Sequence, residues 1–308
     1  MFGQSDTPAG SAFASACAGT HISGAGNPGN SVARTYSGTG TCFEAVSAGG
    51  TASVNTGLVS GVSPSGQAYT GSAEGSASLG SLKMTGTNSG SAQTSFSGGQ
   101  ATVGWNDQIT LGGGTGNSLW VLPILVHGEL HAHGLGALSR MQVGVYKNSA
   151  ALTQGFNSTA FGLFQTLTTE RNGTIQYSWD YQMAAFGVSD YDIVHPTSAE
   201  FLAIDQTVYF VVPFTYGVSF KLGIWADAHA SEIASGGAHV PNVSSFDLGN
   251  TITWGGKGYV VDATGNNPTT SFTINSESGF DYNTAVVPEP STMLMLLAGT
   301  GLLLLKRR

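Results

Sequence analysis

Apolar residues recur at every second position through much of the chain between residues 101 and 280. In the run TIQYSWDYQM, residues 174–183, the aromatic residues Tyr177, Trp179 and Tyr181 alternate with polar ones. Successive side chains of a β-strand point to opposite faces of a sheet, so this pattern is typical of a strand with one buried face. We therefore expect the three aromatic side chains in a core. No stretch of this region keeps the period of about 3.6 residues that an amphipathic helix requires.

Other alternating runs are separated by frequent turn residues. Residues 208–230 are predicted to form two strands around Tyr216-Gly217, and a further turn is predicted at residues 264–268. The segment WVLPILVHGELHAHG is predicted to place one apolar row on a single face, formed by Leu122, Ile124, Val126, Leu130 and Ala132. Many antiparallel strands joined by turns favour an all-β fold, an antiparallel β-sandwich that is jelly-roll-like.

Small residues dominate the first third of the chain. This composition, rich in Gly, Ser, Thr and Ala, leaves little apolar surface to bury, so an irregular Gly/Ser/Thr-rich head is expected over residues 1–65. Thin Gly-rich strands are expected to follow, within a sandwich body over residues 66–285. A separate segment covers residues 286–308.

The two cysteines, Cys17 and Cys42, both lie in the predicted head. In an oxidising compartment a disulfide between them would stabilise the fold by about 3.5 kcal/mol through loop entropy. The alternative is that both remain inert thiols.

Charged residues are scarce, at 9% of the chain, and 18 acidic residues face 10 Lys and Arg. Lys306, Arg307 and Arg308 account for three of those cations. A body with so few cations has no basic surface for a phosphate backbone, which excludes nucleic acid as a partner. Few charges and many small polar residues fit an exported β protein.

The C-terminus reads VVPEPSTMLMLLAGTGLLLLKRR. Residues 291–305 carry no charge, and as a helix they would span about 22 Å, somewhat less than the ~30 Å hydrocarbon core of a bilayer. The basic residues 306–308 favour the cytoplasmic side. We therefore predict a short transmembrane helix, with its C-terminus cytoplasmic and residues 1–285 on the outer side.

The order Pro288-Glu289-Pro290, apolar segment and basic cluster resembles the PEP-CTERM sorting signal of exopolysaccharide-producing Gram-negative bacteria. The resemblance implies processing by exosortase, a membrane-embedded enzyme. It also implies association with the cell surface or biofilm matrix. The same C-terminal motif occurs on proteins described as ice-binding, but the Thr-x-Thr pairs at 85–87 and 251–253 do not form a regular array.

Proteins with this signal also carry an N-terminal secretion signal. Residues 1–20 contain neither a basic region nor an apolar region of the required length. We therefore expect that the true beginning of the protein precedes this sequence.

A histidine-rich row offers the strongest alternative function. On a strand, His127, Glu129, His131 and His133 face one way, and histidines two positions apart can chelate zinc. The four residues would span about 20 Å, which is too far for all of them to share one ion. A solvent-facing polar row without a metal is therefore expected, and a metal-dependent enzyme using this row is the alternative.

Trp225 lies on the same predicted strand face as Lys221, Asp227 and His229, opposite an apolar row. An exposed Trp beside polar donors can stack on a sugar ring. The favoured interpretation is a non-enzymatic protein without a cofactor that binds exopolysaccharide through this group. A purely structural matrix protein is the third possibility.

Overall fold

The structure of the protein, a computed structural model, describes residues 8–20, 22–23, 35–36, 40–62, 66, 68–90, 97–134, 137–148, 160–171, 174–183, 188–197, 201–232 and 242–287. For residues 160–171, 174–183 and 188–197 it describes the backbone alone.

One large antiparallel sheet, called the first sheet, runs in the order β14-β13-β12-β11-β16-β9-β1-β4, with β19 also paired to β9. Its strands are β1 Ser11–Thr20, β4 Gly40–Ala48, β9 Ser97–Gly112, β11 Ala137–Lys147, β12 Ala160–Arg171, β13 Thr174–Met183, β14 Val188–Thr197, β16 Phe220–Glu232 and β19 Thr273–Ser276.

The second sheet runs in the order β15-β10-β17-β8-β7-β5, with β18 paired to β10 and β6 paired to β7. Its strands are β5 Ala52–Asn55, β6 Val59–Val62, β7 Ala68–Ser78, β8 Ser81–Gly90, β10 Asn117–His133, β15 Phe201–Thr215, β17 Asn242–Trp254 and β18 Tyr259–Asp262. A separate small ladder joins β2 Ile22–Ser23 and β3 Thr35–Tyr36.

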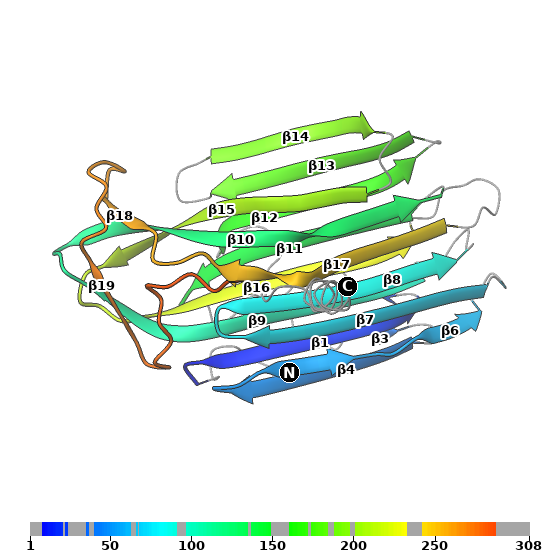
Figure 1. The fold of residues 1–308 in the computed structure, drawn as a ribbon, viewed down its shortest axis with the longest axis horizontal. Coiled ribbons are helices and arrows are strands. Elements are labelled where there is room, and N and C mark those ends of the chain that lie inside the picture. Colours follow the sequence, from blue (N-terminus) through cyan, green and yellow to red (C-terminus); the bar gives the residue numbers. More distant parts are fainter. Residues whose placement is uncertain are drawn as a thin grey trace, which may run out of the picture.

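The strands of both sheets lie along nearly the same axis, with neighbouring strands antiparallel, and β18 and β19 gather at one end (Figure 1). Two of the connections that pass between the sheets at that end lead from β9 to β10 and from β15 to β16. The two crossings are joined by hydrogen bonds from Tyr216 N to Gly116 O at 3.0 Å and from Gly217 N to Leu111 O at 2.9 Å. The predicted turn at Tyr216-Gly217 is therefore confirmed, with Gly217 at φ 74°.

The predicted turn after β18 is confirmed as well. Asp262 organises it: its Oδ1 accepts hydrogen bonds from the backbone N–H groups of Thr264 and Asn266, each at 2.9 Å. Together with a bond from the Thr264 hydroxyl, which is the largest cause, these donors lower the pKa of Asp262 to about 2.

The inner faces of the two sheets share one hydrophobic core. At the β18–β19 end it is aromatic, with Trp120 and Trp254 ring centroids 5.6 Å apart. Towards the other end the first sheet contributes mainly small side chains, namely Ala12, Ala14, Ala16, Ala226, Ala228 and Ala230. The predicted apolar row of β10 also lies in this core, each member at most 1% exposed.

Small residues let strands of opposite sheets come into backbone contact. A Cβ added at Gly75 of β7 would lie 2.9 Å from Val103 of β9, and one at Gly71 would lie 3.1 Å from the Gly98 carbonyl oxygen. Close approach of backbones here replaces the interdigitation of large side chains. This packing explains how a segment of Gly, Ser and Ala forms part of a sandwich.

Several glycines lie directly opposite an aromatic residue on the neighbouring strand, and the ring occupies the space where a Cβ would stand. The pairs are Gly61–Tyr69, Gly86–Phe246, Gly104–Phe13, Gly144–Trp225 and Gly223–Tyr146. Glycine has no side chain of its own to cover its backbone. The aromatic ring from the neighbouring strand covers it instead, so the Gly-rich strands remain well packed.

The all-β, antiparallel class predicted from the sequence is confirmed for the described residues, and two sheets facing one core fit the predicted sandwich. The jelly-roll connectivity is wrong, because β11, β12, β13 and β14 follow one another as neighbours in a single sheet. In a jelly roll, successive strands alternate between two sheets.

The irregular head expected over residues 1–65 is also wrong. Strand β1 lies between β4 and β9 in the first sheet, and β5 and β6 pair with β7 in the second. The expected boundary at residue 65 therefore cuts through both sheets. Composition predicted an irregular segment because small residues carry little apolar area to bury. In the structure these residues pack because they let the strand backbones approach closely.

Cys17 and Cys42 form a disulfide between β1 and β4. They are directly opposite each other in the ladder, with Cα atoms 4.2 Å apart. The bond thus ties the edge strand β4 to its neighbour.

Candidate functional site

The last described segment, residues 273–287, is a strap that lies against the end of the sandwich. It begins as β19, which pairs with β9 from Thr273 opposite Gly112 to Ser276 opposite Ile109. It then continues without regular structure and ends at Val287, whose side chain is 79% exposed. We call it the terminal strap.

A buried carboxylate, Asp107 of β9, holds the terminal strap. Its Oδ2 accepts hydrogen bonds from the hydroxyls of Ser276 and Ser278, both at 2.6 Å, and from the Tyr282 hydroxyl at 3.0 Å. Asp107 is 0% exposed, so its carboxylate has no contact with water. The three hydroxyl groups supply the hydrogen bonds that water would otherwise provide. A charged acceptor makes each bond stronger than a neutral pair would be.

Aromatic packing secures the same segment. The ring centroid of Tyr282 lies 5.1 Å from that of Trp254 and 6.2 Å from that of Trp105. Trp254 Nε1 donates to the Tyr282 carbonyl at 2.9 Å, and Val286 N donates to the Trp254 carbonyl at 2.8 Å. Burial raises the pKa of Tyr282 well above its ordinary value, and the negative charge of Asp107 adds to this shift.

The residue after the terminal strap is Pro288, the first proline of the predicted sorting signal. The anchoring contacts reach Val286, so almost no chain separates the folded body from Pro288. The signal itself, with Glu289, Pro290, the expected transmembrane helix and the cations 306–308, lies outside the described residues. Within the part that is described, no helix is long and apolar enough to cross a membrane.

Comparison with protein families decides the nature of this terminus. Residues 286–308 match the PEP-CTERM protein-sorting motif. The chain carries a PEP-CTERM sorting signal. The signal identifies it as an exported protein that is processed by exosortase. No curated protein and no solved structure matches the chain.

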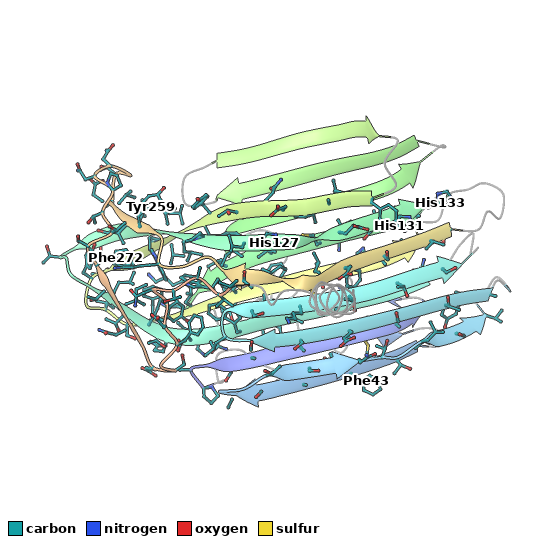
Figure 2. All side chains as sticks on the ribbon, viewed as in Figure 1. Phe43, His127, His131, His133, Tyr259 and Phe272 are labelled. Atoms are coloured by element: carbon teal, nitrogen blue, oxygen red, sulfur yellow. A yellow bond between two sulfur atoms is a disulfide. The ribbon has the colours of Figure 1, made fainter. Side chains whose placement is uncertain are left out.

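The folded body carries the predicted histidine row on the outer face of β10, and Figure 2 shows His127, His131 and His133 in succession along this strand. Each of the first two contacts the residue opposite it on β15. His127 Nδ1 lies 2.8 Å from Asp205 Oδ1, and the His131 ring stacks on Phe201 with centroids 4.3 Å apart.

The row pairs with β15 only as far as His131, and His127 and His131 have separate partners on that strand. Among the described residues, no group of three or more His, Cys, Asp or Glu side chains is arranged to hold a metal ion. Glu129 and His133 are exposed, as the prediction of a solvent-facing row requires.

The predicted sugar platform at Trp225 is wrong. Trp225 is only 5% exposed and packs in a small cluster with Tyr146 and Phe13 on the face of the first sheet that is turned away from the core. Its ring fills the space over Gly144, where a Cβ would lie 2.7 Å away. A buried ring cannot offer its face to a sugar.

Asp227, another member of that group, is also buried, at 3% exposure. Its Oδ2 accepts hydrogen bonds from Gln100 Nε2 at 2.8 Å and from Thr102 Oγ1 at 2.6 Å. Lys221 and His229, the remaining members, are half-buried on the same strand. The carboxylate therefore serves to join β16 to β9.

The backbone of β13 confirms the strand predicted over residues 174–183. The side chains of Tyr177, Trp179 and Tyr181, expected in the core, lie outside the described part of the structure.

Sequence reasoning missed Asp107 and its partners. Asp107 and Tyr282 are 175 positions apart, and neither belongs to a recognisable motif. The available signal was local: the polar run Asn106-Asp107-Gln108 interrupts a strand made mostly of apolar and small residues. A carboxylate within such a strand requires partners when it is buried.

Proposed function

We propose that this chain is a non-enzymatic sandwich protein that exosortase delivers to the cell surface or biofilm matrix in its folded form. The observation that carries the proposal is the match of residues 286–308 to the sorting motif, directly after a segment anchored to the body. The sandwich is the domain that is exported, and residues 286–308 are the signal that sorts it.

In this proposal the apolar residues 291–305 cross the inner membrane and Lys306, Arg307 and Arg308 stay in the cytoplasm. Pro288 and Pro290 have a fixed φ and no N–H group, so they favour an extended segment where the chain leaves the bilayer. Extended backbone is what a processing enzyme needs at its cleavage site, and Glu289 adds one charge for recognition.

Processing at the motif would leave the body intact. All the strap residues that bind Asp107 or pack on Trp254 precede Pro288 in the chain. Their contacts therefore survive removal of the signal, and the released sandwich keeps its core closed at this end.

The role at the destination is best supported as structural. Three features suit a durable matrix component. They are the compact Gly-rich sandwich, the disulfide between β1 and β4, and the side-chain contacts between β10 and β15 on the outer face. Exopolysaccharide binding remains a prediction made from the sequence, since the burial of Trp225 removes the site first assigned to it.

Deletion of residues 288–308 tests the proposal. In a host without exosortase, and behind a functional secretion leader, the deleted protein should appear in the medium while the full chain is held at the membrane. A deleted protein that stays equally attached to membranes would place the anchor elsewhere in the chain.

A further inference from the structure

A second small apolar cluster lies on the outer face of the second sheet. Val121 of β10 stands opposite Val211 of β15 on one side and Tyr259 of β18 on the other. These valines and Val261 form a cluster separate from the main core, with Leu119 packed against it. We call this group, together with Tyr209 and Tyr259, the tyrosine–valine patch.

The two tyrosines are the exposed part of the patch. Tyr209 is 47% exposed and Tyr259 is 37% exposed, while the valines beneath are at most 7% exposed. The patch contains no Asp, Glu, Lys, Arg or His. A tyrosine with an apolar ring and a polar hydroxyl is the residue type that concentrates at the water–lipid interface.

The patch lies beside the point where the sorting signal leaves the body. Gly255 N donates to the carbonyl of Pro123, which stands opposite Tyr209 on β15. The next residue, Gly256, lies next to the terminal strap, and a Cβ added there would be in ordinary contact with Ala285 N, at 3.5 Å. Tyr259 follows three positions later, and Val287 two positions after Ala285.

The reach of the chain limits how far the body can move from the bilayer. From Val287 to residue 291, where the uncharged segment begins, there are four peptide steps, which span about 14 Å when fully extended. While that segment is in the membrane, the surface around Val287 must stay within this distance of the headgroups.

We propose that the tyrosine–valine patch rests on the lipid headgroup layer while the sorting signal is still attached. The inference rests on the proposed membrane insertion of residues 291–305. It orients the body with the β18 end of the second sheet toward the bilayer. Two tyrosines bury too little area to hold a protein at a membrane alone, so the contact ends when exosortase removes the tether.

The opposite edge of the molecule supplies a matched comparison. Phe43 of β4 is 47% exposed, the same as Tyr209, but it lies in the first sheet, and Figure 2 shows it far from Tyr259. The two places therefore do not differ in exposed aromatic area. They differ in their distance from Val287, where the sorting signal leaves the body.

Fluorescent reporters on the full chain in phosphatidylcholine vesicles test the inference. A cysteine-linked fluorophore is placed at Thr207, exposed beside Tyr209, at Glu44, exposed beside Phe43, and at Leu302 in the apolar segment. The disulfide keeps Cys17 and Cys42 from reacting. Spin-labelled lipid should quench the reporter at residue 207 at least about twofold more than the one at residue 44. The double substitution Tyr209→Ser, Tyr259→Ser should abolish this difference.

The reporter at residue 302 distinguishes failure of the proposed membrane insertion from failure of the proposed patch contact. If it is quenched while those at residues 207 and 44 behave alike, the patch does not face the bilayer and the inference is overturned, although the proposed insertion stands. If it is not quenched, the insertion fails and the inference falls with it. Protection of the reporter at residue 207 by a soluble neutral glucan, without lipid quenching, would make the patch a glycan surface and also overturn the inference.

Discussion

The ring of Trp225 occupies the space over Gly144, the residue directly opposite it on the neighbouring strand β11. Tyr146 stands in the same relation to Gly223, so the two strands exchange an aromatic ring for a glycine in both directions. The pair explains why a Trp on a polar strand face is buried. It also gives glycine a specific place in the sheet.

Substitution of Gly144 by Ala should destabilise the protein. The new methyl group would lie 2.7 Å from the Trp225 ring, closer than atoms in contact can be. Overpacking of this kind costs about 1–3 kcal/mol, which a urea titration of the unfolding free energy can measure. Gly50→Ala is the control, because its added Cβ meets only the end of the flexible Ser47 side chain. Equal stability of the two variants would show that the ring can move aside.

Asp107 should contribute far more to stability than an exposed aspartate. Asp107→Ala leaves two serine hydroxyls and the Tyr282 hydroxyl without their acceptor, and we expect a loss of about 3 kcal/mol or more. Asp205→Ala, which breaks only the exposed pair with His127, should cost about 0.5 kcal/mol or less. Chemical denaturation of both variants provides the comparison. Similar losses in both would contradict the role assigned to Asp107.

Tyr282 should make the protein sensitive to alkali. Its pKa is raised in the folded state, so folding favours the protonated phenol. The stability that this provides is complete below the ordinary tyrosine pKa of about 10 and is lost as the pH rises above it. Tyr282→Phe should be less stable at neutral pH, because it loses the bond to Asp107. Its stability should then fall less steeply above pH 10 than that of the wild type. The test is to measure the denaturation midpoints of both proteins from neutral pH to above pH 10. If the midpoints of wild type and Tyr282→Phe fall in parallel, the role assigned to Tyr282 is wrong.

Strand positions could be predicted where side chains alternate clearly. The apolar row of β10, the strand β13 and the turn between β15 and β16 all follow from local patterns. In these places each residue's preference agrees with its final environment. Local alternation is enough to identify such strands.

Other features depend on partners that are distant in the sequence. Strand β1 looked irregular because its alanines bury little area, and only the close approach of β7 makes them a core. Trp225 looked exposed because its neighbours on the strand are polar, but burial was decided by Gly144 across the ladder. The bond between Asp107 and Tyr282 joins residues 175 positions apart, and the polar residues around Asp107 do not indicate which partner it has.

The central claim, that Pro288, Glu289 and Pro290 form a specific exosortase signal, is tested most directly by following the mass of the chain in a host with the enzyme. Wild type should shorten. The variant Pro288→Gly, Pro290→Gly keeps a break before the apolar segment but loses the motif, and Glu289→Gln loses only the charge. Both should remain at full length and bound to membranes. Normal shortening of both variants would contradict specific recognition and leave the prolines as nothing more than a helix stop.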